Sequence, residues 1–197
     1  MPDIREADIS GNAKFRGGLK AEKLKLGGTV KVEGDMEAEE IEISGSGSVN
    51  GDVKARKLTV SGRLEVGGNV SAEELRISGV LRSGVVEAGE AEISGDARFT
   101  ELTAQRVRLR SSTRVKGRVV ARVIETEKRV QADELYGDLV KVGKESRVRV
   151  VEGREVIVQK GADVKEVRYT EEAEIDPGAS VGRAVKVAKL TREPGEG

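Results

Sequence analysis

The chain has 197 residues, of which 36% are charged and 2% aromatic, and 35 Lys and Arg balance 35 Asp and Glu. Because it contains no cysteine and no histidine, disulfides, thiolate or imidazole metal sites and a histidine general base are excluded. A net charge of zero argues against nucleic-acid binding by the chain as a whole, and no stretch approaches the ~20 apolar residues of a membrane span.

Residues 1–9 have neither the basic start nor the apolar core of a signal peptide, so we expect a cytoplasmic protein. From about residue 7 the sequence then repeats a hydrophobic frame. Residues 32–45 read VEGDMEAEEIEISG, and residues 49–62 read VNGDVKARKLTVSG. The apolar positions of the two stretches coincide, whereas the acids between them have become Lys and Arg. A repeat of this kind has to be followed along the chain before any other pattern is interpreted.

Equivalent apolar residues recur every 16 or 17 positions up to residue 190. One column contains Leu24, Ile41, Leu58, Leu75, Ala91, Val107, Ile124, Val140, Val156, Ala173 and Leu190. A second column, which we call the alanine column, contains Ala21, Ala38, Ala55, Ala72, Ala88, Ala104 and Ala121. The chain is thus divided into about eleven units of one kind.

Within each unit the apolar residues come in pairs spaced by two, which is the strand period, and glycines mark the corners between the pairs. Three such pairs per unit predict three short strands per coil. We therefore predict an all-β, single-domain parallel β-helix over residues 1–190, followed by a short polar tail, residues 191–197. Parallel strand connections favour a right-handed coil.

The stacked coils explain the change of charge between repeats. Equivalent residues of neighbouring coils lie about 4.8 Å apart, so a column of identical charges would repel itself. The outward column instead largely alternates in sign, through Lys23, Glu40, Lys57 and Glu74. Each exposed pair contributes only ~0–1 kcal/mol, but together the pairs disfavour slipped registers.

The segments GDVKARKLTVSG, GGNVSAEELRISG and GGLKAEKLKLGG, which begin at residues 51, 67 and 17, resemble the repeats of the bactofilins. This resemblance implies a polymer-forming cytoskeletal protein built as a right-handed β-helix. Bactofilins usually have fewer coils and often carry an apolar N-terminal membrane anchor. No such anchor is present in residues 1–9, so we expect polymerisation without direct membrane attachment.

The sequence predicts a non-enzymatic structural protein that assembles end to end without nucleotide. The ends of a β-helix expose unpaired strands and an open core, which a further subunit can cover. The residues expected at this end-to-end interface are Ala7, Ile9, Leu24, Leu26, Val181, Val187 and Leu190.

The alternative function is a rigid scaffold or binding module that stays a monomer or small oligomer. It would use a basic band for an acidic partner, comprising Arg106, Arg108, Arg110, Arg114, Lys116 and Arg118. It could also use an apolar patch on the outside of the coils, formed by Val120, Val123, Tyr136 and Leu139. This patch would serve lateral association unless a loop of the same chain covers it.

An enzyme of the polysaccharide-cleaving β-helix type is the third alternative. Such enzymes carry long loops between strands, for which a repeat of 16 or 17 residues leaves almost no room. We expect no cofactor and no catalytic residue. The expected partners are further copies of the chain and other cytoskeletal or envelope-associated proteins, with no nucleic acid.

Overall fold

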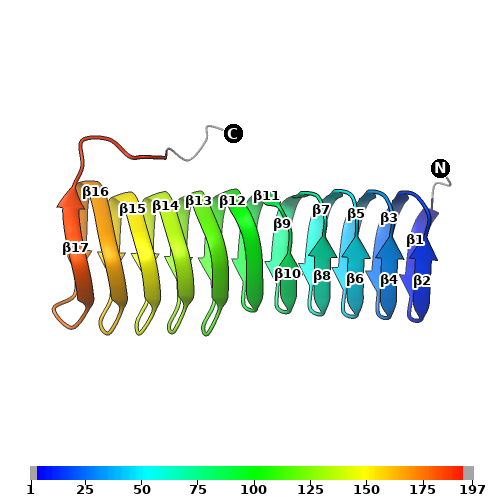
Figure 1. The fold of residues 1–197 in the computed structure, drawn as a ribbon, viewed down its shortest axis with the longest axis horizontal. Coiled ribbons are helices and arrows are strands. Elements are labelled where there is room, and N and C mark those ends of the chain that lie inside the picture. Colours follow the sequence, from blue (N-terminus) through cyan, green and yellow to red (C-terminus); the bar gives the residue numbers. More distant parts are fainter. Residues whose placement is uncertain (1–3, 193–197) are drawn as a thin grey trace.

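The computed structural model describes residues 4–192 and shows an all-β parallel solenoid of about eleven turns, drawn in Figure 1 as a straight row of coils. Residues 1–3 and 193–197, which belong to the two ends of the predicted domains, lie outside the described residues. Among the described residues there is no helix, and so none of a length and hydropathy that could span a bilayer.

The N-terminal part of the solenoid contains two strands per coil. The long strands are β1 (Ile4–Ile9), β3 (Leu19–Leu26), β5 (Met36–Ile43), β7 (Val53–Val60), β9 (Val70–Ile77) and β11 (Val85–Ile93). The short strands are β2 (Asn12–Phe15), β4 (Thr29–Val32), β6 (Ser46–Val49), β8 (Arg63–Val66) and β10 (Val80–Arg82). Long strands pair with long strands and short with short, always in parallel.

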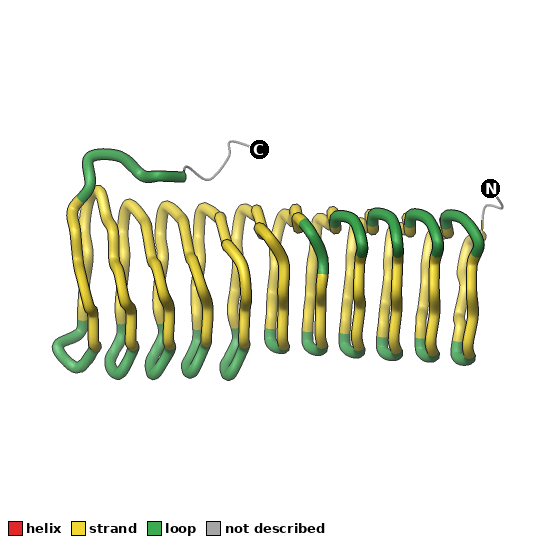
Figure 2. Tube along the Cα trace, viewed as in Figure 1, coloured by secondary structure: helices red, strands yellow, loops and turns green. Residues whose placement is uncertain are grey.

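From β12 onward each coil contains one long bent strand, because β10 and β11 both pair with β12. The loops on one side of the rod disappear at this point (Figure 2). The remaining strands are β12 (Asp96–Leu109), β13 (Arg114–Thr126), β14 (Gln131–Val142), β15 (Arg147–Val158), β16 (Asp163–Ile175) and β17 (Ser180–Lys186).

The observed register matches the predicted columns. Leu24 pairs with Ile41, Ile41 with Leu58, and the same column continues by pairing to Ala173. These side chains form one continuous aliphatic core, in which Leu24, Ile41 and Leu58 are fully buried. Each such side chain contributes ~1.5–3 kcal/mol by leaving water.

The three predicted strands per coil are not confirmed. Along β3, buried residues alternate with more exposed ones, but the alternation shifts phase between Ala21 and Leu24. Two inward pairs therefore share one strand that bends at the corner without losing its pairing. The third inward pair, such as Val30 and Val32, lies on the short strand. The right-handedness of the coil stays a prediction.

The predicted contacts between alternating charges are present. Lys23 Nζ lies 2.6 Å from Glu40 Oε2, one coil away, and Lys57 Nζ lies 3.8 Å from the other oxygen of the same carboxylate. The hydrogen bond from Lys23 lowers the pKa of Glu40, and the same bond raises the pKa of Lys23. Reversal of charge from coil to coil thus turns a repulsive column into a ladder of ion pairs.

Candidate functional site

The N-terminal end of the rod is an open edge. β1 pairs only with β3, and β2 pairs only with β4, so among the described residues one side of each strand has no partner strand. The inward residues of this coil, Ala7, Ile9, Ala13 and Phe15, are partly exposed although they pack against the core. Leu24 and Leu26, which were also expected at the interface, are fully covered by this first coil.

The C-terminal end is formed by β17 and the second half of β16. Ile175, Ala179 and Val181 lie against the core there and remain partly exposed. β17 pairs only with β16 among the described residues and ends at Lys186, which lies opposite Tyr169 in the continuation of the alanine column. Lys186 is exposed, and the chain leaves the coil directly after it.

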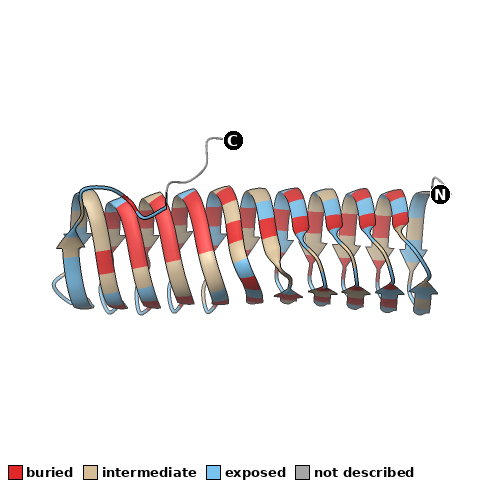
Figure 3. Cartoon of the chain, turned by 45° about the horizontal axis from the view of Figure 1, so that its top comes forward, coloured by how far each residue is buried: buried red, intermediate tan, exposed pale blue. Residues whose placement is uncertain are grey.

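Residues 187–192, which we call the strap, depart from the predicted coil. The strap turns away from the end of the rod and runs back along its side (Figures 1 and 3). Leu190 was expected in the column above Ala173, but it follows the last strand and is buried with 8% exposure. Val187 N donates to Tyr169 O at 2.8 Å, at the point where the strap begins. The terminal coil is therefore left open while the side is covered.

The strap is fastened by Glu152, a carboxylate with 0% exposure on β15. The amide and the hydroxyl of Thr191 both donate to this carboxylate, the hydroxyl at 2.9 Å. Arg168 Nη1 lies 3.5 Å from the same group, which compensates the buried charge. Further along, Arg192 Nη1 donates to Glu101 Oε2 at 3.1 Å. One signal of this contact is visible in the sequence: Glu152 places a carboxylate in a column whose two preceding members are Val120 and Tyr136.

The predicted apolar patch lies beside the strap. Val120 and Tyr136 are directly in register with one another and with Glu152, and both are buried, with 5% and 8% exposure. Figure 3 shows the strap crossing this buried band of the C-terminal coils. Burial raises the pKa of Tyr136, and the Glu134 carboxylate beside its hydroxyl adds to the shift. Val123 and Leu139 lie on the next outward column and are partly exposed.

The predicted basic band is divided between two faces of the rod. Its members on the second half of β12 and directly after this strand pair with acids of neighbouring coils: Arg106 with Glu90 at 3.3 Å, Arg108 with Glu125 at 3.3 Å and Arg110 with Glu127 at 2.7 Å. Arg118 donates to Glu101 at 3.0 Å and to Glu134 at 3.2 Å, and these two bonds raise its pKa. Only Arg114 and Lys116 lie on the other face, which is formed by the first halves of the bent strands.

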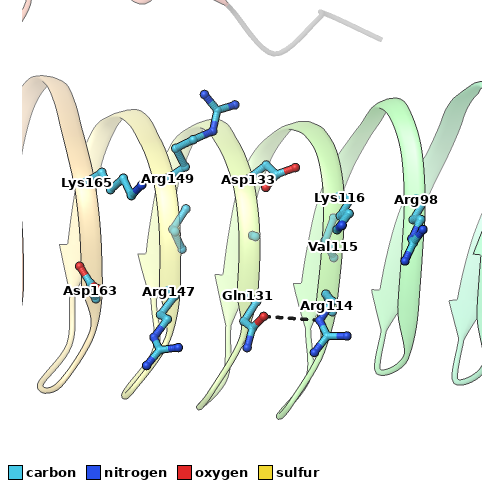
Figure 4. Close-up of a pocket in the computed structure, with 12 residues that line it drawn as sticks. Arg98, Arg114, Val115, Lys116, Gln131, Asp133, Arg147, Arg149, Asp163 and Lys165 are labelled. Carbon is cyan, nitrogen blue, oxygen red and sulfur yellow. Dashed lines mark hydrogen bonds between the residues drawn. The ribbon is translucent and has the colours of Figure 1, made fainter.

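On that face a groove of about 440 Å³ crosses the first halves of β12 to β16. Its floor is the strand backbone at Val115, Ala132 and Val148, whose side chains are buried in the core, and two rows of outward side chains line its sides (Figure 4). The charged residues that line it are Arg98, Arg114, Lys116, Arg147, Arg149 and Lys165, with Asp133 and Asp163. Four of these cations lay outside the predicted band, because the band was defined along the chain and the groove runs across the coils.

These ends and sides offer surfaces for association. No group of three or more acidic, His or Cys side chains within the described part of the chain is placed to hold a metal ion. The carboxylates with lowered pKa are those that accept hydrogen bonds from neighbouring side chains, as Glu127 does from Ser111. The described residues thus present ion-paired carboxylates on a convex rod.

Comparison with known proteins gives one match. Residues 4–81 match the model of the bactofilin family, described as polymer-forming cytoskeletal. No curated protein and no solved structure matches the chain. The matched residues extend from β1 into β10 and include the open N-terminal end. The resemblance to the bactofilins, a structural and cytoskeletal family, is therefore confirmed, and residues 4–81 of this rod carry it.

Proposed function

We propose that the protein is a non-enzymatic structural element that assembles end to end into filaments without nucleotide. The match to a polymer-forming family supports self-association. The observation that carries the end-to-end mode is the open edge at each end of the rod, where the outermost strands pair on one side only within residues 4–192. A second copy placed there continues the backbone ladders and covers Ile9, Phe15 and Val181.

The strap adds support to this mode. It runs along the side of the rod and binds the Glu152 carboxylate, in register with the buried residues Val120 and Tyr136. The apolar surface available to a second copy is therefore concentrated at the ends. In this proposal the interface comprises Ala7, Ile9, Ala13 and Phe15 at one end and Ile175, Ala179 and Val181 at the other.

A charge at either end tests the proposal. Ile9→Lys or Val181→Lys places an ammonium group where a second subunit has to bury apolar surface, at a cost of several kcal/mol. We expect both variants to keep the circular dichroism of the folded rod and to sediment as short species without filaments in negative stain. Leu58→Lys is the matched control, because Leu58 is fully buried in the middle of the rod and its replacement should unfold the protein. Filaments of normal length in both end variants would show that assembly uses the sides.

The alternative function, a rigid scaffold with a binding surface, is supported by the cationic groove rather than by the predicted band. In either function we propose a cytoplasmic protein that uses no cofactor. Its partners would be its own copies and other cytoskeletal or envelope-associated proteins. Capture experiments with filaments and with the monomeric Ile9→Lys variant would separate partners of the side from partners of the ends.

A further inference from the structure

One face of the rod is strongly cationic although the whole chain is neutral. This face consists of the short strands β2 to β10 and the first halves of β12 to β16, and its outward residues form two columns. The columns contain ten cations against four acids. The cations are Lys14, Lys31, Arg63, Arg82, Arg98, Arg114, Lys116, Arg147, Arg149 and Lys165, and the acids are Glu65, Asp96, Asp133 and Asp163.

This face does not show the alternation of charge found in the column of Lys23, Glu40, Lys57 and Glu74. Arg82 lies in register with Arg98, and Arg98 with Lys116. Residue 148 pairs with 164 and residue 150 with 166. Arg149 and Lys165, which lie between these pairs, therefore face each other as well. Like charges placed directly opposite each other across strands destabilise a sheet. Their presence here points to an anionic partner that relieves the repulsion when it binds.

Several of these cations are not neutralised within the protein. Among residues 4–192, the side chains of Lys116, Arg147 and Lys165 make no ion pair or hydrogen bond. Arg98 and Arg114 reach the Asp96 carboxylate only at 3.9 Å. By contrast, Arg106, Arg108 and Arg110 on the neighbouring face each have an acid within 3.3 Å. The unneutralised cations gather in the groove of Figure 4, which has six cations against two acids.

The shape of the groove selects the class of anion. Its two rows of side chains stand two residues apart on each strand, or about 6.6 Å, which leaves room for one extended chain, since neighbouring strands lie about 4.8 Å apart. A nucleic-acid duplex or a bilayer is much wider and would touch only the rims. No aromatic side chain lines the groove, so a single-stranded nucleic acid would lack its base-stacking contribution of ~1–3 kcal/mol per base. A peptide with small side chains between its acids can lie close to the backbone floor while its carboxylates meet the cationic rows.

We propose that this groove binds an extended acidic segment of a partner protein. Five coils span four steps of about 4.8 Å, or roughly 19 Å, which corresponds to about six residues of extended chain. Alternate side chains of such a segment point the same way, so Glu-Ala-Glu-Ala-Glu-Ala presents three carboxylates to the cationic rows. The site lies on the side of the rod, away from the ends, and the binding is therefore independent of end-to-end assembly.

The test is fluorescence anisotropy of a labelled Glu-Ala-Glu-Ala-Glu-Ala peptide with the full-length protein, with the Gln-Ala peptide of equal length as control. We expect binding of the acidic peptide that weakens severalfold between 50 and 300 mM salt, because exposed charges are screened. The double variant Lys116→Glu/Lys165→Glu should weaken it at least tenfold. Since these two lysines have no partner among the described residues, the variant should fold as the wild type does.

Arg122→Glu provides the matched control, because Arg122 is an exposed cation on the same strand as Lys116 but on a different face. This variant should change the affinity less than twofold. The proposal is overturned if the acidic peptide does not bind, or if it binds the double variant as tightly as the wild type. It is also overturned if single-stranded DNA or anionic vesicles are bound in a Lys116- and Lys165-dependent way and the peptide is not.

Discussion

A single methyl group at Gly11 should separate folding from assembly. Glycines occupy one corner of successive coils, and a Cβ added at Gly28 would lie 2.0 Å from the carbonyl oxygen of Gly11 in the preceding coil. The same contact would be 1.9 Å at Gly62, to the oxygen of Gly45. A Cβ added at Gly11 would meet no atom within 4 Å, because this glycine belongs to the first coil. The corner is therefore closed to a methyl group only where another coil lies beneath it.

The magnitude follows from the spacing of the coils. Ordinary contact begins at 3.4 Å, so alanine at Gly62 would force the two coils apart by about 1.5 Å at this corner. The neighbouring hydrogen bonds, such as Arg63 N to Gly45 O at 2.9 Å, would then be broken. At about 0.5–1.5 kcal/mol for each of two or three bonds, Gly62→Ala should destabilise the rod by roughly 1–4 kcal/mol. Gly11→Ala should instead stabilise the isolated subunit by about 0.4–1 kcal/mol, because alanine restricts the unfolded chain.

If a second subunit continues the coil at the N-terminal end, it brings its own backbone beneath Gly11. Gly11→Ala should then raise the critical concentration for filaments, while its melting temperature is equal to or above that of the wild type. Differential scanning calorimetry and pelleting assays on Gly11→Ala, Gly62→Ala and the wild type measure both quantities. Unchanged pelleting of Gly11→Ala would refute a continuous coil at this end, and wild-type stability of Gly62→Ala would refute the close-approach argument itself.

Two further predictions concern the side of the rod. Ending the chain at Lys186 removes the strap and should leave the rod folded but expose Tyr136. The raised pKa of this tyrosine should then return toward 10 in a spectrophotometric titration, and an unchanged titration would show that the strap does not cover it. Burial opposes ionisation of Glu134, but hydrogen bonds from Arg118, Arg149 and Tyr136 outweigh it and hold the pKa below its usual value. This carboxylate therefore stabilises the fold above about pH 4.3 and loses that contribution as the pH falls through the lowered pKa. Glu134→Gln should cost about 1 kcal/mol at pH 7 and reduce the acid-induced loss in thermal unfolding between pH 7 and pH 3; an equal loss in both proteins would contradict this assignment.

The core of this fold could be predicted from the sequence because its apolar residues recur at a constant period. A column such as Leu24, Ile41 and Leu58 repeats at a constant step, and parallel pairing then fixes every contact of the core. The number of strands was less predictable, since a strand can bend at a corner without losing its hydrogen bonds. The period alone therefore defines which residues are inside, but not where one strand ends and the next begins.

The strap was missed because the period was extended past its physical limit. Leu190 stands 17 residues after Ala173 and fits the column by count. The chain nevertheless leaves the coil after Lys186, which continues a column of alanine and glycine that Tyr169 has already broken. Following this column as well would have shown that the repeat weakens before residue 190.

The groove was missed because charges were compared along the chain and not between coils. Along the chain, residues 98–122 form a basic stretch, but most of its arginines are neutralised by acids one coil away. The unneutralised cations Lys116, Arg147 and Lys165 are far apart in sequence and meet only because successive coils stack. In a solenoid, a surface site has to be sought across the repeats, by comparing the outward residues of one column with one another.

The groove and the strap also fall in the same part of the molecule. The match to the bactofilin model ends at residue 81, just before the two ladders merge in β12. The groove is built on β12 to β16, and the strap is fastened to Glu152 on β15 and Glu101 on β12. The N-terminal coils keep the regular alternation of Lys23, Glu40 and Lys57, which favours a uniform and self-complementary rod. The strap and the buried carboxylate that binds it lie on the later coils, so variants in β12 to β17 should alter what the side of the rod binds without altering the N-terminal edge at which we propose that it assembles.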